Sequence, residues 1–310
     1  MNKGTAFTEK YLKLMFKSLR DATPEEVQEE LEHCRRENRR PVRVPRYFRG
    51  HFTTETHTAS TGYEMQVFKH KRPSRKLILY LHGGAFIYPP VFFHWRFMHD
   101  LGLRTHCDLI MTIYPKAPEY NCEYCITTLL DFYQHCVDNQ DYDEIHFVGD
   151  SAGAHLCLVV AQEAHKHGWT MPTSLHLLSP CVDLSHSKAQ EMRALQHLDP
   201  MLQLDRVIIL NAVWQDTLPA IHPWVSPVFG DFSGINNLNV YFGSNEILKP
   251  DSLFLKEAYE NTGKSGRFAE YEGMFHTFPM FPIPEGFRVT RMIADDIKNS
   301  NSGCRNTTTL

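Results

Sequence analysis

The chain has 310 residues, of which 42% are hydrophobic and 22% are charged, and its formal net charge is −4. This hydrophobic content is sufficient for a full core in one domain, whereas the small negative charge excludes the broad basic surface that nucleic-acid binding requires. We therefore expect one globular domain over residues 1–310 that binds no nucleic acid.

Two helices are predicted before residue 45. The first places apolar side chains on one face, at Tyr11, Leu12, Met15, Phe16 and Leu19. In the second, Thr23 as the N-cap, Pro24 at the first helical position and Glu26 three residues after the cap form a capping box.

Basic residues interrupt the first twenty positions, so no secretory signal is expected. No window reaches the ~18 uncharged apolar residues of a membrane span. We expect a cytoplasmic protein without stable membrane insertion. Because the first predicted helix is both basic and amphipathic, a membrane-surface role for it is an alternative.

From residue 52 onward, short apolar runs predict strands, and after residue 76 they alternate with longer amphipathic runs. This alternation is typical of a mostly parallel sheet covered by helices on both faces, an α/β fold. The predicted strands are 52–58, 63–70, 76–82, 108–114, 144–148, 174–178, 239–242 and 268–271. The predicted helices lie near 93–104, 123–137, 152–167, 251–262 and 286–298. The polar and aromatic composition of residues 181–225 predicts an insertion that packs over one end of the sheet. The composition of residues 300–310 predicts a disordered tail.

A serine between two glycines stands where the strand at 144–148 meets the helix at 152–167. The pentapeptide Gly149-Asp150-Ser151-Ala152-Gly153 has the G-x-S-x-G pattern of a nucleophile elbow, in which small neighbours permit a sharp turn. A tight strand-to-helix turn without chemistry is the alternative. The nucleophile elbow is favoured over the plain turn because the chain also contains a candidate oxyanion hole, base and acid, which ester hydrolysis requires.

Backbone amides near that serine are expected from His82-Gly83-Gly84-Ala85-Phe86, which follows the strand at 76–82. Ester hydrolysis places negative charge on the carbonyl oxygen, and N–H groups aimed at that point stabilise it. The predicted oxyanion hole comprises Gly83, Gly84, Ala85 and Ala152.

A serine hydroxyl also needs a base and an acid, in the chain order Ser, acid, His. Among 18 histidines, His276 follows the last predicted strand and is the predicted base. Glu246 and Asp251 both follow the strand at 239–242. We favour Glu246, which comes first after that strand, and expect Asp251 to cap the next helix, although Asp251 remains open as the acid.

These motifs resemble the hormone-sensitive-lipase-like branch (bacterial family IV) of the α/β-hydrolases, over about residues 75–295. The similar segments are the oxyanion motif at 82–86, Tyr114-Pro115-Lys116-Ala117-Pro118-Glu119, the elbow at 149–153, and segments 179–184 and 199–202. Two positions depart from the family pattern: Ala85 replaces a third glycine, and Glu246 stands where aspartate is usual. The resemblance implies an α/β-hydrolase fold whose helical cap comprises about 1–45 and 181–225.

We therefore predict a serine carboxylesterase that hydrolyses short-chain esters through an acyl-enzyme. Its expected partner is a small-molecule ester, it needs no metal or organic cofactor, and a homodimer is left open. The predicted substrate pocket is aromatic and sulfur-rich: Phe86, Tyr88, Met201, Trp214, Met274, Phe278 and Phe281. An amidase or peptidase with the same triad, and a non-catalytic binding protein on the same scaffold, are the alternatives.

The eight cysteines are expected to be reduced thiols, because a chain of this size does not need disulfides to fold. Cys122 and Cys125 form a C-x-x-C pattern. No second pair accompanies them, so a zinc or redox site there is a minor alternative.

Overall fold

The computed structural model describes residues 23–70, 74–138 and 142–300. These residues form an eight-stranded sheet in the order β1-β2-β4-β3-β5-β6-β7-β8. The strands are β1 (Thr53–Thr58), β2 (Glu64–His70), β3 (Lys76–Leu81), β4 (Asp108–Ile113), β5 (Glu144–Asp150), β6 (Ser174–Leu178), β7 (Leu238–Gly243) and β8 (Arg267–Tyr271). Strands β1 and β2 pair antiparallel, β2 pairs antiparallel with β4, and the strands from β4 to β8 run parallel. The predicted mostly parallel sheet and all its predicted strands are confirmed.

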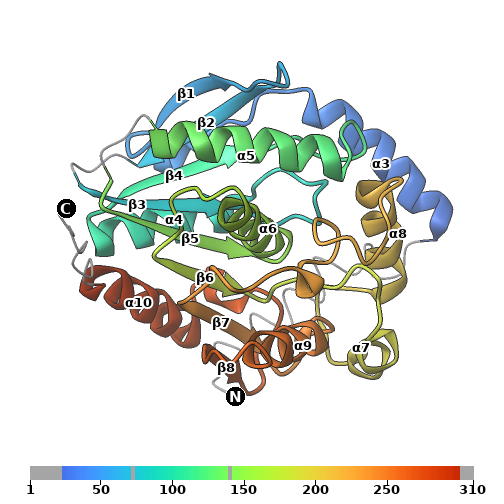
Figure 1. Ribbon diagram of the computed structural model, residues 1–310. Coiled ribbons are helices and arrows are strands. Elements are labelled where there is room, and N and C mark those ends of the chain that lie inside the picture. Colours follow the sequence, from blue (N-terminus) through green and yellow to red (C-terminus); the bar gives the residue numbers. More distant parts are fainter. Residues whose placement is uncertain (1–22, 71–73, 139–141, 301–310) are drawn as a thin grey trace.

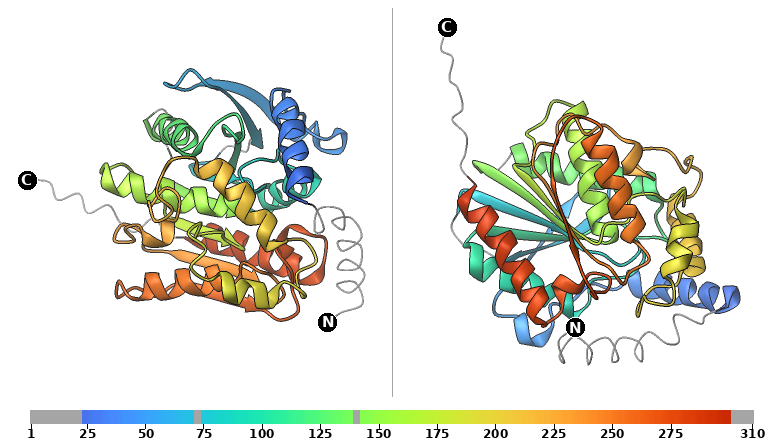
Figure 2. Two further views of the ribbon diagram at one scale, coloured as in Figure 1. Left: turned by 90° about the vertical axis from the view of Figure 1, so that its right-hand side faces the viewer. Right: turned by 90° about the horizontal axis from the view of Figure 1, so that it is seen from below.

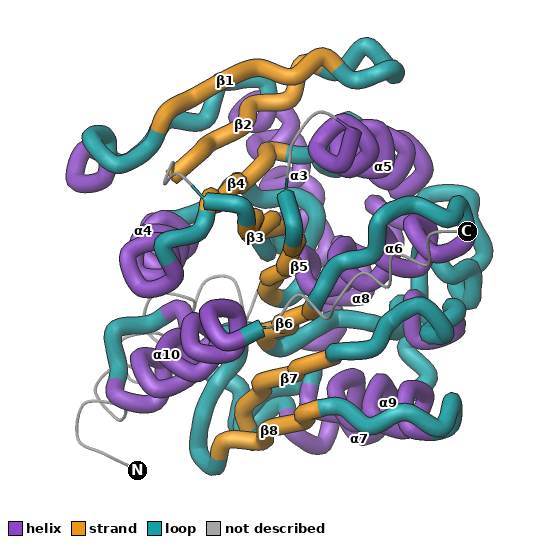
Figure 3. Tube along the Cα trace, turned by 60° about the vertical axis from the view of Figure 1, so that its left-hand side comes forward, coloured by secondary structure: helices purple, strands orange, loops and turns teal. Residues whose placement is uncertain are grey.

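Helices cover both faces of the sheet (Figure 1). The α-helices are α3 (Pro24–Asn38), α4 (Phe92–Thr105), α5 (Cys122–Asp138), α6 (Ala152–Lys166), α7 (Ala189–Leu195), α8 (Leu204–Gln215), α9 (Lys249–Glu260) and α10 (Pro284–Asn299). Short 3-10 turns occur at η1 (Arg46–Phe48), η2 (Pro227–Phe229) and η3 (Phe278–Met280). Figure 3 shows α4 and α10 on one side of the strands and α5, α6 and α9 on the other.

The strands are apolar on both sides because each face of the sheet has its own core. In β3, Leu77, Leu79 and Leu81 pack into the core shared with α5 and α6. The alternate residues Ile78 and Tyr80 pack into the core shared with α4 and α10. Side chains of a strand point alternately to its two faces, so one short apolar run supplies both layers.

Helix α3 begins with the predicted capping box, which is confirmed. The Thr23 hydroxyl accepts the Glu26 N–H at 3.3 Å, and the Glu26 carboxylate accepts the Thr23 N–H at 2.6 Å. Together these bonds satisfy two N–H groups that a helix start leaves without partners.

The insertion after β6 contains α7 and α8. In the left panel of Figure 2, the gold helix α8 lies across the end of the sheet, in front of the strands. With α3, it covers the edge where the parallel strands end; both helices lie in the segments that the resemblance assigned to a cap. The predicted helix over residues 11–19 and the tail 301–310 lie outside the described residues.

Within the described ranges, no helix combines the length and the apolar character needed to cross a membrane.

Candidate active site

Ser151 lies on the sharp turn between β5 and α6. Its φ of 51° and ψ of −119° are unusual for a residue with a side chain. A Cβ on Gly149 would lie 2.6 Å from the Gly153 carbonyl oxygen, and a Cβ on Gly153 would lie 1.9 Å from the Leu81 carbonyl oxygen. Both flanking glycines are therefore steric requirements of the turn that presents the serine.

Ser151, His276 and Glu246 form a continuous row of hydrogen-bonded side chains. His276 Nε2 lies 3.0 Å from Ser151 Oγ, and His276 Nδ1 lies 3.0 Å from Glu246 Oε2. Because a carboxylate only accepts, Nδ1 carries the hydrogen and Nε2 presents its lone pair to the serine hydroxyl. The Glu246 side chain is fully buried, and its Oε1 accepts the Gly243 N–H at 3.1 Å.

The surroundings of His276 favour its protonated form. Burial by itself lowers the pKa of His276, but the hydrogen bond and negative charge of Glu246, together with Asp199 and Asp150, outweigh that effect. The net result is a pKa above the usual value. An imidazole with a raised pKa is a stronger base toward the serine proton.

Asp251 does not cap the next helix, and Glu246 rather than Asp251 is hydrogen-bonded to His276. Helix α9 begins at Lys249 after the N-cap Leu248, so the predicted N-cap at Asp251 is wrong. Pro250 suits the first turn because its missing N–H has no helical partner there. Asp251 is buried, its Oδ2 accepts the N–H groups of Val182 and Asp183 at 2.8 and 3.2 Å, and burial raises its pKa to about 8.

The loop after β3 is held by the buried carboxylate of Asp150. Asp150 Oδ1 accepts the Tyr80 hydroxyl at 2.5 Å and the Gly83 N–H at 3.0 Å, and His94 Nε2 lies 3.4 Å from Oδ2. The Gly83 N–H therefore already has a side-chain partner, and Gly83 is not among the residues that line the cavity, which corrects its prediction as an oxyanion donor. Gly83 instead fixes the loop, because a Cβ there would lie 2.2 Å from Asp150 Oδ2.

The other predicted donors, Gly84, Ala85 and Ala152, line the cavity that contains Ser151. Ala85 adopts a φ of 50°, so alanine does take the left-handed backbone conformation at the position where the family usually has glycine. The Tyr114–Glu119 segment supports this loop from behind: the Tyr114 hydroxyl donates to the His82 carbonyl at 2.7 Å, and the Ala117 N–H donates to the Phe86 carbonyl at 3.0 Å.

A cavity of about 410 Å³ opens beside Ser151 and His276. Four predicted pocket residues line it: Phe86, Tyr88, Met201 and Phe281. Three others do not, which corrects their prediction: Trp214, Met274 and Phe278. Trp214 lies behind the wall, stacked on Phe86 with ring centroids 3.9 Å apart, and the other two are buried in the core beside α10.

Sequence reasoning missed a polar clasp between α3, α8 and the loop after β3. Arg206 of α8 donates to both carboxylate oxygens of Glu30 in α3 at 2.6 Å and to the Tyr88 hydroxyl at 2.6 Å. The Tyr88 hydroxyl donates to Glu30 at 2.8 Å. Arg206 and Tyr88 line the cavity. No local pattern marks these residues, because Glu30 and Arg206 are 176 positions apart.

Cys122 and Cys125 are buried on α5, and all seven cysteines in the described ranges are free thiols. Burial raises the pKa of Cys125 to about 12. A protonated, buried thiol is a poor nucleophile and a poor metal ligand, so these two cysteines act as core residues.

The chain is similar to known ester hydrolases. Residues 78–280 match a family of proteins with the α/β-hydrolase fold. An esterase of Acinetobacter venetianus is 32% identical over 76% of this chain and 78% of its own. Mouse hormone-sensitive lipase is 28% identical over a segment that covers 46% of this chain and 19% of that longer enzyme. The crystal structure of a candidate esterase from Staphylococcus aureus superposes with a TM-score of 0.82 and 25% identity, covering 90% of this chain and 94% of that one.

The sheet order, the turn at Ser151 and these similarities agree with one another. The chain is a carboxylic ester hydrolase that belongs to the α/β-hydrolase family and is similar to hormone-sensitive lipase.

Proposed function

We propose that the chain is a serine carboxylesterase that hydrolyses short-chain esters through an acyl-enzyme intermediate. The observation that carries this assignment is the unbroken row from Ser151 Oγ through the His276 ring to Glu246, with 3.0 Å at each step. The row ends at a cavity that Gly84, Ala85 and Ala152 also line.

In the first half-reaction, Ser151 Oγ attacks the ester carbonyl carbon while His276 Nε2 takes the hydroxyl proton. The N–H groups of Gly84, Ala85 and Ala152 stabilise the negative oxygen of the tetrahedral intermediate. Its collapse breaks the bond to the alcohol, which leaves with the proton from His276. In the second half-reaction, water attacks the acyl-serine, gives its proton to His276, and the carboxylic acid leaves as Ser151 regains the proton.

Glu246 positions the imidazole rather than removing the proton itself. Its Oε2 fixes the Nδ1–H tautomer, and its negative charge stabilises the imidazolium that forms during attack. Glutamate has one methylene more than the usual aspartate. Its carboxylate is still held at hydrogen-bond distance from His276, because Oε1 accepts the Gly243 N–H within the same turn.

The size and closure of the cavity support the preference for short acyl chains. Its volume of about 410 Å³ is close to the lower end of the ~300–1,000 Å³ typical of small-molecule pockets. The Arg206–Glu30–Tyr88 clasp joins both parts of the proposed cap above it. A triglyceride with long chains needs a more open groove.

The nucleophile is tested with a fluorophosphonate probe and mass-spectrometric mapping of the adduct. We expect the adduct on Ser151, and we expect Ser151→Ala to lose both labelling and turnover of p-nitrophenyl butyrate while its circular dichroism stays unchanged. Ser233→Ala is the matched control, because Ser233 is bonded to Asp231 and belongs to neither the triad nor the cavity. This variant should keep both labelling and turnover. Retained turnover in Ser151→Ala would refute the assignment.

The substrate class is tested with a series of p-nitrophenyl esters of increasing acyl length. We expect kcat/KM to peak at acetate or butyrate; a peak at about ten carbons or more contradicts the short-chain assignment. Arg206→Met keeps the bulk of the side chain but removes the clasp, so it should shift the profile toward longer chains. A matched anilide series tests the amidase alternative, and faster anilide than ester turnover would favour it.

A further inference from the structure

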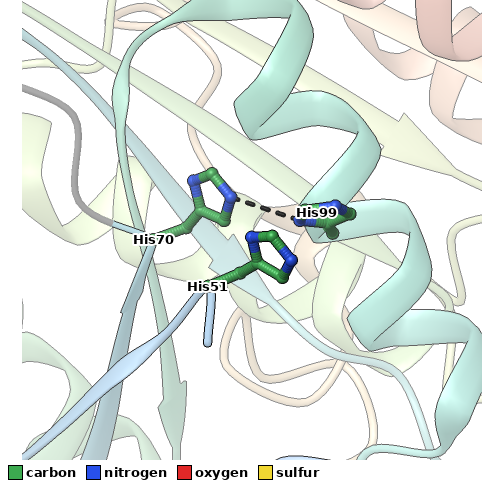
Figure 4. Close-up of side chains that lie close together, drawn as sticks. All are labelled: His51, His70 and His99. Atoms are coloured by element: carbon green, nitrogen blue, oxygen red, sulfur yellow. Dashed lines mark hydrogen bonds between the residues drawn. The ribbon is translucent and has the colours of Figure 1, made fainter. Parts of the chain in front are cut away.

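Three histidines from separate segments meet at the end of the sheet opposite Ser151. His51 lies in the loop before β1, His70 ends β2, and His99 lies in α4. His70 pairs with Leu109 at the start of β4, whereas Ser151 follows the end of the parallel strand β5. The cluster is therefore separate from the candidate active site. Figure 4 shows the three rings turned toward one another.

The spacing of the ring nitrogens fits one metal ion. Each histidine offers a nitrogen, and these three atoms lie within 4.8 Å of one another. His70 Nε2 and His99 Nδ1 are 3.3 Å apart. Zinc–nitrogen bonds of ~2.0–2.1 Å at tetrahedral angles place two ligand nitrogens about 3.3–3.4 Å apart, so this pair already has the required separation.

The third ligand can adjust to the other two. The His51 and His99 ring centroids are 4.2 Å apart, and the rings are inclined by 50°. His51 is exposed and lies on a turn, whereas His70 is buried and sits on a strand. A rotation of the exposed side chain therefore brings its nitrogen to the fixed pair and leaves the outer position open to water as a fourth ligand.

The surroundings hold His70 and His99 in place. A Cβ on Gly102 would lie 2.7 Å from His70 Nδ1, so glycine allows α4 to pack directly against this ring. Phe52 packs edge-on against His70 at 5.2 Å between ring centroids, and Phe48 lies 5.5 Å from His99. These contacts fix two of the three rings and exclude water from one side of the cluster.

We propose that His51, His70 and His99 form a zinc site that fastens the loop before β1 to β2 and α4. The donor set selects the metal class, because neutral imidazole suits zinc and its divalent neighbours, whereas magnesium and calcium require oxygen ligands. When the metal binds, both nitrogens of the His70–His99 hydrogen bond become ligands, and the ring that donates in this bond carries its hydrogen on its other nitrogen instead, so each ligand stays a neutral imidazole. This site goes beyond the sequence expectation of no metal.

The proposal is tested by titrating zinc chloride into the full chain, without an affinity tag, by isothermal calorimetry at pH 7.5. We expect one ion per chain with a micromolar or tighter Kd. Removal of a group that only hydrogen-bonds to a metal ligand weakens metal binding by ~10–100-fold, so loss of a direct ligand in His51→Asn should weaken it by about 100-fold. Because His51 is exposed, this variant should fold normally.

His57→Asn is the matched control. His57 belongs to a separate pair, with its ring centroid 4.6 Å from that of His135, and it pairs with Met65 near the start of β2, whereas His70 ends that strand. Zinc binding should survive in His57→Asn. Equal affinity in wild type and His51→Asn, or loss in His57→Asn alone, would overturn the proposal.

Two further readouts separate a built site from loose surface binding. Cobalt chloride should give the intense visible absorption of a tetrahedral ion in wild type and not in His99→Asn. Zinc at about 100 times its wild-type Kd should raise the Tm of wild type by about 4 °C, and the shift should fall to under about 1 °C in His51→Asn. A wild type that shows neither the cobalt spectrum nor the Tm shift contradicts the site.

Discussion

Asp199 Oδ2 accepts the backbone N–H of Ile247 at 2.9 Å, so the insertion after β6 is fastened to the loop that carries Glu246. Asp199 Oδ1 accepts the N–H groups of Met201 and Leu202 at 2.8 and 2.9 Å. Asp199 is fully buried, and all of these partners are donors. The family-like segment at 199–202 therefore anchors the proposed acid of the triad without contacting Ser151.

Asp199→Asn should weaken this anchor because an amide has only one accepting end. Its NH2 group must face at least one of the backbone donors, and a buried donor without an acceptor costs ~1–3 kcal/mol. We expect the free energy of unfolding, measured in urea, to fall by about 2 kcal/mol. Esterase kcat should also fall, since the Glu246 loop becomes less fixed. Unchanged values of both quantities would show that the anchor is dispensable.

Glu246→Gln tests the acid through both rate and pH dependence. The Gly243 N–H takes the single amide oxygen, so the NH2 group faces His276 Nδ1 and favours the wrong tautomer, and the neutral amide does not stabilise the imidazolium. The value of kcat should therefore drop by about 10³-fold or more. Glu246 raises the pKa of His276. Since the base must be neutral to accept the serine proton, the acidic limb of kcat/KM in wild type should lie above the usual histidine value and move to lower pH in the variant. An acidic limb that does not move would show that Glu246 does not control the pKa of His276.

Asp251→Asn is the contrasting variant and acts on stability. The folded pKa of Asp251 is raised from 3.8 to about 8 by burial. The folded state therefore holds a proton that the unfolded state has released, and stability should fall as pH rises from about 4 to about 8. Asparagine keeps an oxygen for the Val182 and Asp183 N–H groups but cannot ionise, so urea melts should show a flatter pH dependence. Activity should be largely retained, and a collapse of kcat would return the acid role to Asp251.

Ala85 tests whether its backbone conformation is needed for the oxyanion hole. Ala85→Gly removes the strain of a φ of 50° but adds flexibility to the unfolded chain, so stability and kcat should both change little. Ala85→Val places a β-branched residue in a conformation that it avoids. Misdirection of one N–H donor should then lower kcat by about 10²-fold with KM nearly unchanged. Equal kcat in both variants would exclude Ala85 as a donor.

The fold class and most element boundaries could be predicted from local sequence. Alternating apolar runs and amphipathic segments reflect burial of a parallel sheet between two helix layers, and the strand at 174–178 is found with the predicted limits. The sharp turn at Ser151 could also be predicted from its two flanking glycines, because the turn sterically excludes any Cβ at 149 and 153. Chain order and position after the predicted strands then suggested His276 and favoured Glu246 over Asp251.

Pocket residues and polar anchors required the tertiary structure. An aromatic residue has the same pattern whether it lines a cavity, as Phe281 does, or lies in the core, as Phe278 does. The sequence predicted Gly83 as an oxyanion donor, but in the structure its N–H donates a hydrogen bond to Asp150. Hydrogen-bond direction depends on which loops face each other, and sequence spacing does not encode that.

The amino-acid sequence by itself determined the alternation of strands and helices and the sharp turn at Ser151, because both follow from short-range sterics and burial. Only the tertiary structure decided which distant residues meet: Asp199 with Ile247, Arg206 with Glu30, and the three histidines at the end of the sheet opposite Ser151. Such contacts arise when separate segments pack against one another, so their partners are chosen by the whole fold.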